Sequence, residues 1–260
     1  MIANGDAKAA IAELEPIWET NKNNFALCQL LVDAYSDRID QVSFLKKRGV
    51  AKTMLATMEQ CYDIKPDDET AQLNLIMFHT QAPSSVGGDK EAAERLIKDI
   101  SAKYPSRGFL MKARLAISED DFAAAESFAH QAIEIEPDNV EALNVAGLIA
   151  LQQNQYVNAI ELFKRCVSAD KQNFDCHYQI GKTAHLSGEY AQDGITAFER
   201  FIRNGHDNPE YLAHAHYRLA ELYLSTDNQR KARPHLETAV TLAGLKSARK
   251  RLAKLSKSGG

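Results

Sequence analysis

The sequence predicts an all-α protein, built as a solenoid of antiparallel helix pairs. Aromatic residues recur at a fixed interval of 34 residues, at Phe122, Tyr156 and Tyr190, and such an interval is typical of stacked structural repeats. The composition favours helices, because Ala is abundant while 260 residues hold only 13 Gly and 7 Pro. The longest apolar run, residues 145–151, is too short to span a bilayer. Together these features exclude a collagen-like chain, a disordered chain, a disulfide-rich miniprotein and a membrane channel.

Each period of the repeat contains two amphipathic helices joined by a short polar turn. In one period, apolar residues at helical spacing predict a first helix over 141–153 and a second over 156–169. Small residues recur at the same interval, at Ala113, Gly147 and Gly181, and they let neighbouring backbones approach closely. Because neither helix can bury its apolar face alone, neighbouring pairs must stack against one another.

These residues resemble the tetratricopeptide repeat (TPR) family, in arrays of the bacterial type, whose period is about 34 residues with a small–aromatic–small–proline pattern. One unit shows the pattern as Gly147, Tyr156, Ala159 and Phe163. The resemblance implies a right-handed superhelix of about six repeats, with a partial N-terminal unit and a C-terminal capping helix. The four units that match well are Ser106–Pro137, Val140–Asn173, Phe174–Asp207 and Ala213–Gly244.

The resemblance also predicts how one continuous solenoid is organised along the chain. Residues 7–20 resemble the second helix of a unit whose first helix is absent, so the sequence is expected to begin within a repeat, either as a fragment or after removal of a leader. This incomplete unit should expose Leu14, Ile17 and Trp18 unless something covers them, and a second copy of the chain could do so. The predicted parts are residues 1–105 with divergent TPR-like units and insertions, residues 106–244 with regular units, and residues 245–260 with a capping helix and tail.

Two insertions distinguish the N-terminal units from the regular ones. Residues 36–50 lengthen one unit by about ten residues beyond the family period, and they predict longer helices, not a loop. Residues 81–85 interrupt the next unit. The segment 87–90, Gly-Gly-Asp-Lys, lacks the Lys-Ser/Thr pair of a phosphate-binding loop. Asp89 is therefore expected to cap a helix that begins at Lys90.

No residue pattern indicates catalysis, a metal site or a cofactor. The sequence has no nucleophile-elbow motif, and its histidines lack the spacing of a metal site. The cysteines are expected to pack in the core. Cys28 with Cys61, and Cys166 with Cys176, nevertheless lie on helices predicted to be adjacent, so disulfides stay open as an alternative for an exported protein.

The predicted binding surface lies on the first helix of each unit, because these helices line a concave groove in TPR proteins. Residues three and four apart share a helix face, which gives one row of side chains per unit. The predicted groove residues are Arg107, Leu110, Arg114, Asn144, Leu148, Leu151, Tyr178, Lys182, His185, Tyr217 and Glu221.

Two kinds of contact are expected from this surface. Arg114 and Lys182 would pair with a carboxylate of the partner. Alternatively, Leu148 and Leu151 pack between neighbouring units and take no part in binding. Leu110 and Leu148 stand where some TPR modules place polar clamp residues for chaperone C-termini, so a chaperone tail is not expected. The apolar residues expected to form an exposed patch, a common mark of interaction sites, are Leu148, Leu151, Tyr178 and Tyr217.

The sequence thus predicts a non-catalytic scaffold that binds a protein or peptide, with no cofactor. The alternative is a structural protein that self-assembles through its incomplete N-terminal unit, and it would be a homo-oligomer. A net charge of −4 argues against nucleic acid as a partner, and no membrane span is predicted. Residues 82–89 are similar to a segment of exported bacterial TPR proteins, which favours the periplasm over the cytoplasm. The identity of the partner does not follow from the fold.

Overall fold

The computed structural model describes residues 6–258, with side chains through residue 256. Within these residues the chain forms fourteen α-helices and one 3-10 helix, and no strand. The helices are α1 Ala7–Thr20, α2 Phe25–Gln41, α3 Phe44–Ile64, α4 Glu69–Gln81, η1 Ser84–Val86, α5 Lys90–Lys103, α6 Pro105–Ser118, α7 Phe122–Ile135, α8 Val140–Gln152, α9 Tyr156–Ala169, α10 Phe174–Ser187, α11 Ala191–Asn204, α12 Pro209–Ser225, α13 Gln229–Ala243 and α14 Lys246–Ser258.

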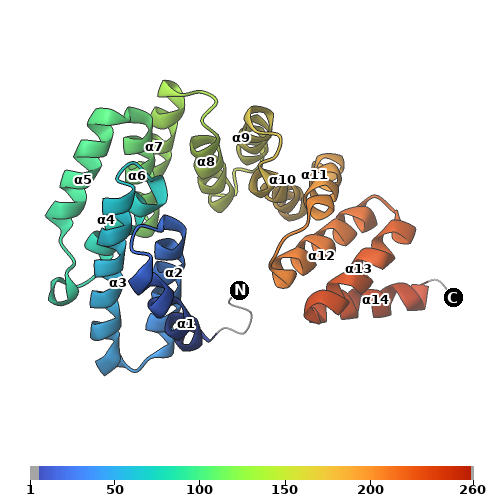
Figure 1. Ribbon diagram of the computed structural model, residues 1–260. Helices are drawn as coiled ribbons and strands as arrows, with labels where there is room; N and C mark the ends of the chain where they lie inside the picture. Colours follow the sequence, from blue (N-terminus) through green and yellow to red (C-terminus); the bar gives the residue numbers. More distant parts are fainter. Residues whose placement is uncertain (1–5, 259–260) are drawn as a thin grey trace. The chain divides into compact units, whose positions relative to one another are not determined.

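The chain divides into two compact units, Met1–Met111 and Lys112–Gly260, and the boundary falls inside α6. In the N-terminal unit, each of the helices α1 to α4 contacts the next in chain order. In the C-terminal unit, α8–α9, α10–α11 and α12–α13 pack as antiparallel hairpins (Figure 1). This pairwise packing of helices confirms the predicted fold class.

Helix starts are set by polar caps. Nine of the described helices follow an Asp or Asn whose side chain accepts a hydrogen bond from the backbone N–H three residues on. Asn139, for example, accepts from the N–H of Ala142 at 3.0 Å. Asp89 accepts from the N–H of Ala92 at 3.1 Å, which confirms its predicted role as the cap of α5.

The small residues of the repeat make room for buried rings. A β-carbon at Gly147 on α8 would lie 2.5 Å from the Phe163 ring of α9, and one at Gly181 on α10 would lie 2.4 Å from the Phe198 ring of α11. Both rings are fully buried. In two successive repeats a glycine on the first helix therefore lies directly under an aromatic ring of the second, which explains why small residues recur at the repeat interval.

The N-terminal unit contains the predicted lengthened helices. Residues 36–50 are helical except at Val42 and Ser43, where α2 gives way to the 21-residue α3. After α4, the inserted segment forms η1 and then turns at Gly87, whose φ of 109° is accessible mainly to glycine. The prediction of longer helices over 36–50 is confirmed.

The predicted exposure of α1 is wrong for Trp18. This side chain is only 5% exposed because it packs into the core of the N-terminal unit, together with Leu31 and Tyr35. Ile17 is 52% exposed, and Leu14 packs partly buried against the same core. The N-terminal unit therefore covers the aromatic anchor of its first helix with its own residues.

Two disulfides join neighbouring helices. Cys28–Cys61 links α2 to α3 with 5.7 Å between the Cα atoms, and Cys166–Cys176 links α9 to α10 with 6.3 Å. The structure thus resolves the alternative left open for the cysteines in favour of pairing. At the C-terminal end, α14 packs on α13 and buries Ala248. Across the described part of the chain, no helix is both long enough and apolar enough to cross a bilayer.

Candidate functional site

The predicted groove residues lie on the first helices of the repeats. In the C-terminal unit α10 contacts both α8 and α12, so the faces of these three helices adjoin. We call the face that carries Asn144 of α8, Lys182 of α10 and Tyr217 of α12 the first-helix face. Arg107 and Leu110, on the same side of α6, belong to the N-terminal unit and are described separately.

The expected apolar patch on this face does not form. Leu151 is 7% exposed and Tyr178 is 5% exposed, and Leu148 and Tyr217 are half-buried. Leu110 in the N-terminal unit is fully buried as well. The burial of Leu151 agrees with the alternative in which Leu148 and Leu151 pack between neighbouring units, and a role of either in binding stays a prediction.

Tyr178 is buried because aromatic residues of its own and the following repeat surround it. Its ring stacks on Tyr211 of α12 with centroids 4.2 Å apart and contacts the rings of Phe198 and Phe201 of α11 at 5.7 and 5.2 Å. Burial raises the pKa of the Tyr178 hydroxyl, while the charge of Arg218 opposes that rise. The hydroxyl of Tyr178 accepts a hydrogen bond from Arg218 Nη1 at 2.6 Å.

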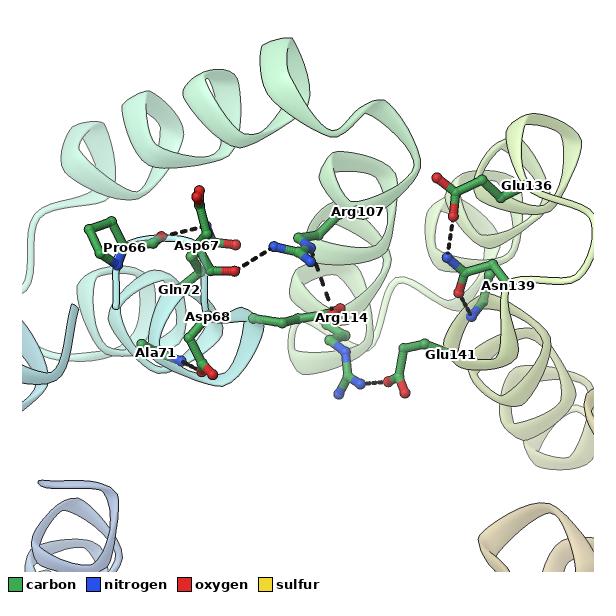
Figure 2. A network of polar contacts seen from close by, with 12 residues as sticks. Pro66, Asp67, Asp68, Ala71, Gln72, Arg107, Arg114, Glu136, Asn139 and Glu141 are labelled. Carbon is green, nitrogen blue, oxygen red and sulfur yellow. Dashed lines mark hydrogen bonds and ion pairs between the residues drawn. The ribbon is translucent and has the colours of Figure 1, made fainter. Parts of the chain in front are cut away.

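Arginine side chains link the first helices of neighbouring repeats. In the N-terminal unit, Arg107 Nη1 of α6 donates to the backbone oxygen of Asp67 at 2.8 Å (Figure 2). Its Nε lies 3.7 Å from a carboxylate oxygen of Glu69 on α4. In the C-terminal unit, Arg114 of α6 pairs with Glu141 of α8 (Figure 2).

The same kind of link continues toward the C-terminal end of the chain. Arg218 of α12 reaches Tyr178 of α10, and Arg251 of α14 pairs with Glu221 of α12 at 2.9 Å. The predicted pairing of Arg114 with a partner's carboxylate is therefore met by Glu141 of the protein itself. Glu221, another predicted groove residue, is likewise engaged.

Between α8 and α10 the face carries polar groups with unused hydrogen-bonding capacity. The side-chain oxygens Oδ1 of Asn144 and Oε1 of Gln179 are buried and accept no hydrogen bond from the protein. A buried acceptor without a partner costs free energy, so a donor supplied from outside would stabilise both. Gln179 is not among the predicted groove residues. Counting along α10 from Asp175, a step of three residues reaches Tyr178 and a step of four reaches Gln179, so helical spacing alone would have allowed either.

Positive charge collects beside these acceptors. Burial lowers the pKa of Lys182 and the charge of Arg218 lowers it further, and the same two causes lower the pKa of His185. In the described part of the chain, neither Lys182 nor Arg218 forms an ion pair with a carboxylate. His185 also contacts the Tyr217 ring, with centroids 6.4 Å apart. An anion placed here would offset the mutual repulsion of the two cations.

A pair of histidines lies on the other side of α12. His216 is buried, and its Nδ1 lies 2.8 Å from Nδ1 of His235 on α13. Tyr223 stacks on His235 and its hydroxyl bonds to Glu199 of α11. Burial and the neighbouring His235 lower the pKa of His216 to about 4. No group of three or more His, Cys, Asp or Glu able to hold a metal occurs among the described residues.

Comparisons with known proteins follow the same division into repeats. Residues 110–174 and 213–244 match models of the tetratricopeptide repeat. The mitochondrial import receptor subunit TOM70 of Homo sapiens is 22% identical over 192 residues, which is 69% of this chain and 30% of TOM70. TOM70 of Mus musculus matches to the same extent. The chain thus spans 30% of the length of these curated relatives.

Several solved structures share the fold. YrrB, described as a TPR protein with an unusual peptide-binding site, superposes with a TM-score of 0.54 at 16% identity, over 76% of this chain and 97% of YrrB. The human IFIT1 dimer with PPP-AAAA gives 0.57 at 15% identity, over 98% of this chain and 59% of IFIT1. At these identities the likeness concerns the fold alone. Residues 110–174 and 213–244 thus match the tetratricopeptide repeat, and the helix hairpins and their 34-residue interval are of the same kind.

Proposed function

We propose that this protein is a non-catalytic scaffold that binds a carboxylate-bearing peptide segment on the first-helix face of its C-terminal unit. The observation that carries the proposal is the pair of cations Lys182 and Arg218, which lie close enough for the charge of Arg218 to lower the pKa of Lys182 and have no carboxylate partner in the described residues. A carboxylate seated between them would form charge-assisted hydrogen bonds, the strongest kind in proteins.

The unpaired acceptors beside the cations fit the backbone of such a peptide. Asn144 Oδ1 and Gln179 Oε1 accept no hydrogen bond within the protein, and an extended peptide presents N–H donors along its length. The peptide-binding title of YrrB is in keeping with this class of ligand. The buried Tyr178 and Leu151 would act only as support beneath the face, which corrects their predicted role as contact residues.

The test is selection from a displayed library of random peptides, followed by affinity measurements on a selected peptide by fluorescence polarisation. Selected peptides should be enriched in Asp and Glu. Lys182→Gln should weaken binding about tenfold or more, because a hydrogen bond to a charged group contributes about 1.5–3 kcal/mol. Lys171→Gln is the matched control, since Lys171 is an exposed lysine in the turn before α10.

Binding that is equally sensitive to both substitutions would point to general electrostatic attraction and contradict the proposed site. Selected peptides without acidic residues would contradict the proposed ligand. A ligand like the PPP-AAAA named for the IFIT1 structure is a poor alternative for this chain, because a net charge of −4 disfavours a polyphosphate or nucleic acid.

The alternative function, self-association through the N-terminal unit, was based on apolar residues exposed on α1, and the structure buries the largest of them. Trp18 is covered by the same chain, and Ile17 is the exposed apolar residue of α1. A homo-oligomer stays a prediction, which light scattering over a dilution series tests. Constant mass at that of one chain would contradict it.

We further propose that the protein works in an oxidising compartment, the periplasm of a bacterium. The two disulfides support this, because structural disulfides persist where thiols are oxidised and are rare in the cytosol. Thiol counting under denaturing conditions on protein taken from its native cells tests the proposal. Four free thiols would contradict it.

A further inference from the structure

The two insertions of the N-terminal unit meet around a cavity. It has a volume of about 790 Å³ and is lined by α2, residues 44–58 of α3, α4 and the segment around η1. His79 Nδ1 of α4 lies 3.1 Å from the backbone oxygen of Gly87, which ties the inserted segment to α4. Gly87 also lies against Leu55 of α3, where a β-carbon would come within 2.4 Å of a side-chain carbon. The cavity is therefore built by the segments that depart from the regular repeat.

The inner lining of this cavity is apolar and adaptable. Three methionines, Met54, Met58 and Met77, line it together with Phe78 and Val86. Methionine is unbranched and polarisable, and it is common where a surface must fit flexible apolar ligands. The volume lies within the range of about 300–1,000 Å³ that is usual for small-molecule sites.

The charged residues of the lining are all cationic. Lys47 and Arg48, on the first turns of α3, line the cavity, and no Asp or Glu does. The carboxylate nearest to Lys47 is that of Asp40, at 3.9 Å and mostly exposed, which makes a weak pair. Phe44 and Leu45 at the rim are 87% and 89% exposed. An apolar cavity with cations and exposed apolar residues at its mouth complements a molecule with an alkyl chain and an anionic head.

We propose that the N-terminal unit binds an anionic amphiphile, with its single alkyl chain among the methionines and its anionic head at Lys47 and Arg48. The chain displaces water from apolar surface, so affinity should rise about fourfold for each CH₂ that enters the cavity. The head pairs with two cations that have no strong partner of their own. Phe44 and Leu45 would cover the part of the chain that leaves the cavity.

Isothermal titration of the full chain with laurate, below its micelle-forming concentration, tests the proposal. Laurate should bind at one site per chain, about fifteenfold more tightly than decanoate, which is two CH₂ shorter. Dodecanol, which lacks the charge, should bind at least tenfold more weakly than laurate. A lack of laurate binding, or equal affinities for laurate and decanoate, would overturn the proposal.

Matched double variants distinguish laurate binding at this cavity from general electrostatic attraction. Lys47→Gln with Arg48→Gln should weaken laurate binding at least tenfold, whereas Lys46→Gln with Lys52→Gln makes the same charge change on exposed residues of α3 outside the cavity and should leave it unchanged. Equal losses in the two double variants would overturn the assignment. Met77→Trp, which places a bulkier side chain in the apolar lining, should weaken laurate binding while the thermal unfolding curve shows a folded protein.

A vesicle assay distinguishes a free amphiphile from a membrane lipid as the source of the ligand. Vesicles of phosphatidylglycerol and phosphatidylcholine are sedimented with the wild type and with Met77→Trp. Sedimentation that is lost in Met77→Trp supports entry of a lipid chain into the cavity. Sedimentation without any binding of monomeric laurate would overturn the proposal, because surface charge alone would then explain it.

Discussion

Replacing Gly147 by alanine should destabilise the C-terminal unit, although alanine is the better helix former. The added methyl carbon would lie 2.5, 2.8 and 2.9 Å from three ring atoms of Phe163. The ring is fully buried, so it cannot swing into solvent. Overpacking of a core costs about 1–3 kcal/mol, and the gain in helix propensity returns about 1 kcal/mol. With three contacts this close, we expect a net loss of about 1–2 kcal/mol.

The matched control is Gly49→Ala in α3 of the N-terminal unit. No atom lies within 4 Å of a β-carbon at Gly49, so only the helix propensity changes and the variant should gain about 0.5–1 kcal/mol. Urea unfolding followed by far-UV circular dichroism measures both variants, and fluorescence of the single tryptophan, Trp18, follows the N-terminal unit separately. If Gly147→Ala raised the stability as Gly49→Ala does, the packing argument would be refuted.

Three other perturbations have defined outcomes. Reducing Cys28–Cys61, which closes a sequence separation of 33 residues, should cost the N-terminal unit about 3–4 kcal/mol by the loop-entropy relation, as urea unfolding with and without reductant will show. The pKa of His216 is lowered to about 4 in the folded state, so the unfolded chain takes up the proton first and stability should fall as the pH drops from about 6.5 to 4, by on the order of 3 kcal/mol. Thermal unfolding against pH checks this, and His216→Gln, but not exposed His130→Gln, should flatten the profile. Arg114→Gln should cost at most about 1 kcal/mol in the same unfolding assay, because the ion pair that it removes is about one third exposed.

The helices of the regular repeats could be predicted nearly to the residue because their signals are local. The predicted second helix over 156–169 is α9, and the predicted first helix over 141–153 is shifted by one residue in α8. Caps such as Asn139 and the turn before Tyr156 lie within a few residues of the helix ends that they set. Helical periodicity also placed Phe163 of α9 on the buried side.

The exposure and pairing of the candidate site residues depend on contacts between repeats, and helical periodicity within one helix gives no information about such contacts. Tyr178 faces the side predicted for the groove, but Tyr211 of the next repeat covers it. Arg114 is on the predicted side too, and Glu141 of the next first helix pairs with it. The cavity of the N-terminal unit escaped prediction for a related reason, since it forms where two separate insertions come together.

The Cys166–Cys176 disulfide joins the second helix of one repeat to the first helix of the next, in addition to the turn 170–173 that already connects them. In a linear array whose repeats contact only their neighbours, unravelling that starts at a free end spreads one repeat at a time. A covalent link across such a junction stops that spread, because α9 and α10 cannot separate even when both have lost their packing. Tension on a bound partner would therefore peel the C-terminal helices only as far as α10, and the repeats on the N-terminal side of the link would keep their arrangement.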